Sequence, residues 1–75
     1  MDIQHMHTMY ETGRLMDVVA IPSREDHGWH VDCHDLWGHT LHLTTQQGQP
    51  CSFSNLDSAS EAAQKIGFRE IRIDE

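Results

Sequence analysis

The chain has few basic residues, and this scarcity limits the partners that it can bind directly. Its 75 residues include five lysines and arginines against twelve aspartates and glutamates, for a formal net charge of -7 with histidine neutral. Proteins that bind nucleic acid usually carry a basic patch, so we expect no direct binding of DNA or RNA. An acidic surface suits a basic protein partner, and it equally aids solubility.

The chain also lacks long apolar runs. No stretch approaches the roughly 20 apolar residues that cross a membrane, so we expect no membrane partner. Residues 1–10 are polar and have no apolar centre of the kind found in a secretory signal. We therefore expect a cytoplasmic protein of one small domain, with a core near the lower limit of what folds alone.

Two glycines define a pair of hairpins. Trp29, Val31 and Cys33 alternate with polar residues, as a half-buried strand requires. Placing Cys33 opposite Leu41 needs the three-residue loop 36–38, and glycine at its last position tolerates the left-handed backbone that such loops use. The loop 46–48 also has three residues and ends in glycine, so the same loop geometry fixes the pairing of the strands on either side of it. This register predicts that Asp32 lies directly across from His42.

The rest of the chain completes an α+β fold. Residues 1–13 have no strong period and are expected to form a flexible arm before a single domain at 14–75. Leu15–Ile21 reads as a strand with apolar residues on both faces, Pro50 begins a fourth strand, and Phe68–Asp74 forms a fifth. A helix with Leu56, Ala59, Ala63 and Ile66 on one face is capped by Asn55 or Ser58 and stopped by Gly67.

The predicted topology is β-β-β-β-α-β. Numbered along the chain, the strands of this five-stranded, mostly antiparallel sheet take the order 4-3-2-1-5, with the fifth strand antiparallel to the first and the helix packed on one face. The other face stays open. The residues expected in the core are Trp29, Val31, Leu41, Leu43, Phe53, Leu56, Ala63, Ile66 and Ile71.

The two cysteines are predicted to be reduced. In this register Cys33 and Cys51 face the core on strands that are two apart, which separates them by about 9.6 Å and exceeds the reach of a disulfide. Both would then be inaccessible as nucleophiles. No phosphate-binding loop or nucleophile elbow is present, so we expect no enzymatic activity.

Histidines gather around a carboxylate on the open face. The register brings together His30, Asp32, His34 and His42. Imidazole suits zinc and nickel, and this set could hold such an ion. It could also respond to pH, or form a polar face in contact with water.

The tip of the first hairpin offers a second candidate site. Leu36 and Trp37 lie there with no core nearby, and exposed aromatic residues often mark contact surfaces. Alternatively, Trp37 folds back onto the edge of the sheet.

Three segments carry a resemblance to known proteins. They are 13–22 (GRLMDVVAIP), 28–31 (GWHV), and 53–59 (FSNLDSA) together with 66–68 (IGF). With them, the chain from Gly13 to Glu75 resembles short proteins of plasmids and integrative conjugative elements that are associated with partition or replication. The resemblance implies a bacterial cytoplasmic accessory protein of a mobile element and carries over no catalytic residue.

Our expectation is a non-enzymatic protein that works through contacts with a protein partner or as a homodimer. One alternative is a DNA-associated factor of plasmid partition or replication. The other is a histidine-based metal-binding module.

Overall fold

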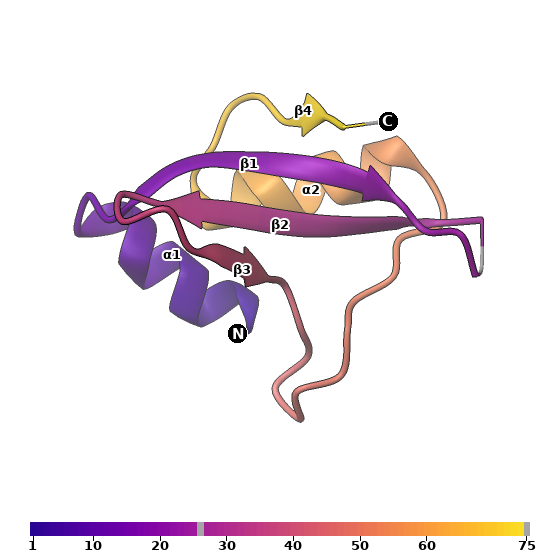
Figure 1. Cartoon of the computed structure of the whole chain (residues 1–75), viewed down its shortest axis with the longest axis horizontal. Helices are drawn as coiled ribbons and strands as arrows, with labels where there is room; N and C mark the ends of the chain where they lie inside the picture. Colours follow the sequence, from indigo (N-terminus) through magenta and orange to yellow (C-terminus); the bar gives the residue numbers. More distant parts are fainter. Residues whose placement is uncertain (26, 75) are drawn as a thin grey trace.

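The computed structural model describes residues 1–25 and 27–74. In this part of the chain the elements are α1 (Ile3–Glu11), β1 (Leu15–Pro22), β2 (Trp29–Asp35), β3 (Thr40–His42), α2 (Leu56–Ile66) and β4 (Arg72–Ile73) (Figure 1). The described strands form one four-stranded sheet in the order β3-β2-β1-β4. Strand β1 pairs antiparallel with β2 and parallel with β4, while β3 pairs antiparallel with β2. The α+β class is confirmed.

Both helices pack on the same face of the sheet. In Figure 1, α2 passes behind β1 and β2. Met6 of α1 and Ile66 of α2 are fully buried, and the Cys33 thiol on β2 contacts the Met6 sulfur at 3.7 Å. The buried cluster consists of Met6, Val18, Val31, Cys33, Leu43, Ala59, Ala62, Ala63 and Ile66. This core lies between the sheet and the helix pair, so the opposite face of the sheet remains open.

The predicted core is confirmed only in part. Val31, Leu43, Ala63 and Ile66 are buried. Four larger side chains pack against this cluster but stay half-buried: Trp29, Leu41, Phe53 and Ile71. Leu56 is also half-buried. The centre is instead filled by Met6 and by three alanines of α2, whose small side chains let the helix approach the strands closely.

The predicted fourth strand is wrong. Residues 50–53 form only isolated bridges, in which Pro50 pairs with Thr44 and Phe53 pairs with Trp29. Strand β3 is three residues long, so the Trp29 end of β2, which pairs with β1 on one side, has no β3 partner on the other. The chain turns out through residues 45–49 and returns so that Phe53 occupies that end, with hydrogen bonds in both directions to Trp29.

The predicted direction of the last strand changes for the same reason, while its predicted place beside the first strand is confirmed. Phe53 runs antiparallel to β2, hence in the direction of β1. The connection through α2 then returns the chain parallel to β1, where β4 pairs Arg72 with Val19 and Ile73 with Ala20. The sheet is therefore mixed and has four strands, in place of five strands in the order 4-3-2-1-5.

Residues 1–13 differ from the flexible arm expected there. They contain α1, which begins after Asp2, whose carboxylate accepts a hydrogen bond from the His5 amide. Met6 anchors the helix in the core. A second link is the hydrogen bond of 2.9 Å between His7 Nδ1 and the carbonyl of Ile66 at the end of α2. Tertiary contacts therefore stabilise α1, although the apolar residues of this segment show little helical periodicity.

The helix predicted near the C-terminal end is confirmed with its caps. Asn55 is the N-cap, and its side chain accepts a hydrogen bond from the Ser58 amide at 2.8 Å. Gly67 follows the last turn, and the amides of Gly67 and Phe68 both donate to the carbonyl of Ala63. This pattern satisfies the carbonyl groups that a helix end leaves unpaired.

Candidate functional site

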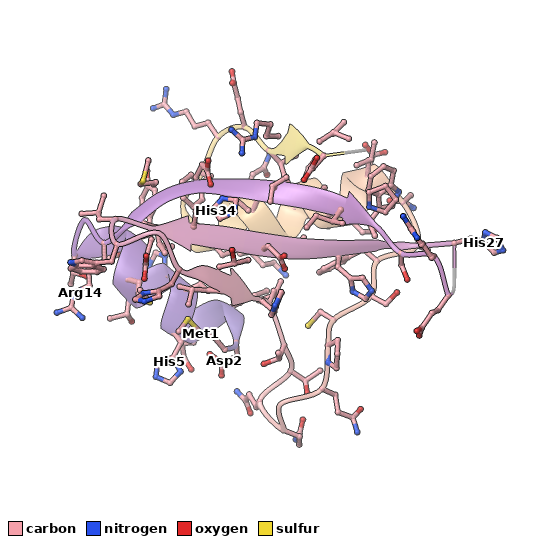
Figure 2. All side chains as sticks on the ribbon, viewed as in Figure 1. Met1, Asp2, His5, Arg14, His27 and His34 are labelled. Carbon is pink, nitrogen blue, oxygen red and sulfur yellow. The ribbon has the colours of Figure 1, made fainter. Side chains whose placement is uncertain are left out.

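The hairpin register that builds the open face is confirmed. Asp32 pairs with His42, and Cys33 pairs with Leu41. Gly38 and Gly48 have φ of 87° and 90°, as their loops require. His30, Asp32, His34 and His42 therefore lie on one face, the one turned away from the helices. Figure 2 shows His34 over β1 and β2.

His30, His34 and His42 each form a hydrogen bond through Nδ1, and each bond goes to a different oxygen atom. His42 Nδ1 lies 2.8 Å from Asp32 Oδ1, and His34 Nδ1 lies 2.6 Å from Asp17 Oδ1. His30 Nδ1 lies 3.0 Å from the carbonyl oxygen of Cys51. Because a carboxylate or a carbonyl can only accept a hydrogen bond, Nδ1 carries the proton in each case.

These separate partners spread the candidate metal ligands apart. Within residues 1–25 and 27–74, no group of three or more histidine, cysteine, aspartate or glutamate side chains is arranged to hold a metal ion. Asp32 binds one imidazole, and Asp17 binds another. The four predicted residues share a face but do not converge on one point, so the geometry gives no support to a zinc or nickel site.

The open face is less hydrated than its polar residues suggest. Asp32 and Val19 are nearly inaccessible, with relative exposures of 5% and 2%. Arg72 is opposite Val19 in the register and reaches Asp17, where its guanidinium lies 3.4 Å from Oδ2. A groove of about 700 Å³ adjoins this surface and is lined by His30, Asp32 and His42 together with residues of the flanking loops.

The hairpin tip exposes the second predicted site. Leu36 and Trp37 keep relative exposures of 56% and 64%, so Trp37 does not fold onto the sheet. The Leu36 amide donates to the carbonyl of Arg14, which fixes the tip against the start of β1. Met16, at the irregular pairing between Leu15 and Asp17, is 62% exposed at the same end of the sheet.

Asp35 holds this tip in shape. Its buried carboxylate accepts hydrogen bonds from the amides of Trp37 and His39 at 2.9 and 2.8 Å, and His39 Nδ1 lies 2.9 Å from the second oxygen. Burial opposes ionisation of this carboxyl. The hydrogen bonds from His39 and Trp37 outweigh it and hold the pKa of Asp35 below its usual value.

Sequence reasoning missed three members of these sites: Asp17, Asp35 and His39. A signal for Asp35 was present, because aspartate before a tight loop often accepts hydrogen bonds from the backbone of the loop. Asp17 has no such signal. Its pairing with His34 depends on the irregular register after Leu15.

Both cysteine thiols have raised pKa values. Burial, followed by the charges of Asp17 and Asp32, raises the pKa of Cys33 to about 12. Burial also raises the pKa of Cys51, which is half-buried where the sequence predicted a core position. Both thiols are free, as predicted. A thiol with a raised pKa is a poor nucleophile at neutral pH.

No protein-family model, curated protein or solved structure matches this chain. Neither helix in the part of the chain that the structure describes has the length and apolar content needed to span a membrane. The local chemistry is therefore the guide to what the protein does.

Proposed function

We propose that this chain is a non-enzymatic accessory protein that acts through protein contacts at the tip of the β2–β3 hairpin. Its setting, in this proposal, is the cytoplasm of a bacterium that carries a mobile element, as the resemblance of residues 13–75 implies. The partner is another protein or a second copy of this chain.

The observation that carries the proposal is an exposed aromatic residue on an ordered loop. Three hydrogen bonds to Asp35 and one between Leu36 and Arg14 fix the backbone around Trp37. Because the loop is already ordered, it would lose little conformational entropy when a partner buries Trp37. Large aromatic side chains in such positions supply much of the binding energy of protein interfaces.

Trp37→Ala tests the proposal. It removes no core contact, so the melting temperature should stay close to that of the unchanged protein. Association should weaken by about 2 kcal/mol or more, as expected for the loss of an aromatic anchor. Ile73→Ala is the matched control, because Ile73 is also exposed but lies on β4 at the other edge of the sheet.

The partner can be found with a photo-crosslinking amino acid at position 36, and with the same group at position 73 as control. Self-association of the pure protein is measured in parallel by sedimentation. A discrete cross-linked species from position 36 alone would support the tip as the contact. A large loss of stability in Trp37→Ala with unchanged association would mean that Trp37 is structural and would remove this proposal.

A further inference from the structure

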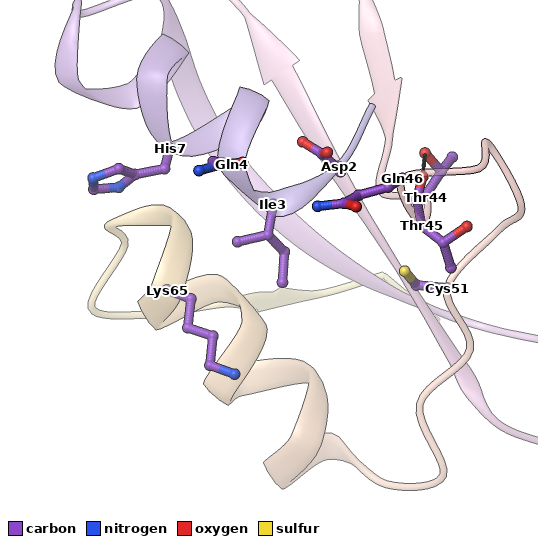
Figure 3. A pocket seen from close by; sticks show the side chains of 9 residues that line it. All are labelled: Asp2, Ile3, Gln4, His7, Thr44, Thr45, Gln46, Cys51 and Lys65. Carbon is purple, nitrogen blue, oxygen red and sulfur yellow. Dashed lines mark hydrogen bonds between the residues drawn. The ribbon is translucent and has the colours of Figure 1, made fainter.

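A second cavity lies on the helical side of the molecule, away from the hairpin tip. It has a volume of about 490 Å³ and opens between the start of α1, the last turns of α2 and the connection that follows β3 (Figure 3). Small-molecule sites commonly occupy about 300–1,000 Å³ and combine an apolar wall with few polar groups. The cavity therefore has room for a small ligand.

The middle of this cavity is apolar. Figure 3 shows Ile3 reaching from α1 toward α2, with the sulfur of Cys51 turned to the same space. Ile3 and Cys51 both pack against the core cluster from its edge. An alkyl chain placed here would cover apolar surface that the fold leaves half-exposed.

Most of the charged groups around the cavity are already engaged. Asp2 caps α1 through its bond to the His5 amide. His7 uses Nδ1 on the carbonyl of Ile66 and Nε2 on Glu11, at 2.9 and 2.6 Å. In contrast, no carboxylate of residues 1–25 or 27–74 forms an ion pair with Lys65.

Lys65 and Asp2 lie at opposite ends of the cavity, with Ile3 between them (Figure 3). A ligand that is apolar along its length and anionic at one end would match the ammonium of Lys65 and the apolar wall. We propose that this cavity binds an amphipathic monocarboxylate, with its alkyl chain against Ile3 and Cys51 and its carboxylate at Lys65. This site is independent of the contact function proposed for Trp37.

Octanoate is the probe, and the alkylation rate of Cys51 by iodoacetamide is the signal. Cys33 is fully buried, so Cys51 is the thiol that reports on the cavity. Octanoate should slow alkylation in a saturable way, and the side-chain methyl signals of Ile3 in NMR spectra should shift with the same midpoint. Octan-1-ol, which lacks the charge, should bind more weakly.

Three variants separate recognition of the anion from general charge effects. Lys65→Gln should weaken octanoate binding about three- to tenfold, the range expected for a partly exposed ion pair and its hydrogen bond. Lys65→Arg should keep most of the affinity. Arg69→Gln makes the same change in net charge outside the cavity and should leave octanoate binding unchanged.

Three results would overturn the proposal. One is the absence of saturable effects of octanoate on both Cys51 and Ile3. The others are equal binding of octanoate and octan-1-ol, and equal effects of Lys65→Gln and Arg69→Gln, either of which would remove the role of Lys65. None of these results bears on Trp37, so this failure is distinct from failure of the contact function.

Discussion

Asp35 links the packing of β2 to the exposed loop that follows it. Its carboxylate is buried, yet its hydrogen bonds to His39 and Trp37 lower its pKa. A carboxyl whose pKa is lower in the folded state adds stability above its ordinary value of 3.8 and loses that contribution as the pH falls through the lower folded value.

The first prediction concerns acid unfolding. The free energy of unfolding of the natural protein should fall as the pH drops below 3.8. Asp35→Asn cannot ionise, so it should be less stable at neutral pH and should lose less stability on acidification. Urea titrations from neutral pH to about pH 2 measure both profiles. Glu61→Gln removes an exposed carboxylate of α2 and serves as the control. Parallel profiles for Asp35→Asn and the natural protein would contradict the role of this carboxylate.

The thiol of Cys33 has a raised pKa, so it affects stability at alkaline pH, whereas Asp35 affects stability at acidic pH. Burial and the nearby charges of Asp17 and Asp32 raise its pKa from 9.0 to about 12. Above pH 9.0 the unfolded chain releases the thiol proton while the folded chain retains it, so stability should fall as the pH rises from 9.0 toward 12. In Cys33→Val the slope over this range should be smaller, when unfolding is measured under reducing conditions. An unchanged slope would show that Cys33 is not the group responsible.

At the scale of elements, the β2–β3 hairpin and α2 were predictable because their signals are local. Alternating side chains, glycines at fixed loop positions, a capping Asn55 and a terminal Gly67 each constrain a few neighbouring residues. Two independent loops gave one register, and that register placed Asp32 opposite His42. The candidate face followed directly from it.

The elements that failed depend on contacts between distant segments. Helix α1 is held largely by one buried side chain, Met6, and by the bond from His7 to Ile66, which no period in residues 1–13 reveals. Residues 50–53 were expected to continue the sheet in the register set by Gly48. Phe53 pairs with Trp29 instead because β3 ends early, and this reverses the direction expected for β4. The spread of the predicted metal ligands has a similar origin, since the carboxylate of Asp17 binds His34 from another strand.

Gly67 provides a prediction at the junction of α1 and α2. Its φ is 138°, and a Cβ at this position would overlap the ring of Tyr10. Gly13 has φ of 75°, and a methyl group added there would meet open space, so it isolates the backbone penalty alone. Gly13→Ala should cost about 1 kcal/mol, and Gly67→Ala should cost about 2–4 kcal/mol because the steric overlap adds to the backbone strain.

A double-mutant cycle with Tyr10 separates the steric overlap at position 67 from the backbone strain there. Tyr10→Ala alone loses the edge-to-face contact with Phe68, whose ring lies 4.8 Å away between centroids. In that background Gly67→Ala should lose the steric part of its cost and keep only the backbone penalty, which exceeds that of Gly13→Ala because φ of 138° lies outside the left-handed region that other residues tolerate. Urea denaturation gives all the values. Equal costs of Gly67→Ala with and without Tyr10 would show that the ring moves aside freely.

At the scale of the whole molecule, charge and layering divide the surface into unlike parts. The helices cover one face of the sheet, and the open face carries paired carboxylates and imidazoles. Arg14 and Arg24 flank opposite ends of β1, and Figure 2 shows Arg14 at one end of the sheet. Lys65, Arg69 and Arg72 are closer together in the sequence, but Glu70 lies among them and Arg72 is paired with Asp17. The basic side chains are thus divided between the ends of β1 and residues 65–72, in a chain of net charge -7.

This distribution predicts weak binding to nucleic acid. Affinity for duplex DNA rises with the number of phosphates that lysine and arginine side chains neutralise together, and a dispersed set neutralises few. The pure protein should bind duplex DNA no more tightly than about 10⁻⁴ M at physiological salt, measured by fluorescence anisotropy. Any residual binding should disappear as salt is raised, because it can only come from release of counterions. A saturable increase in anisotropy at micromolar protein would instead favour a DNA-associated factor of plasmid partition or replication over the contact function proposed for the Leu36–Trp37 tip.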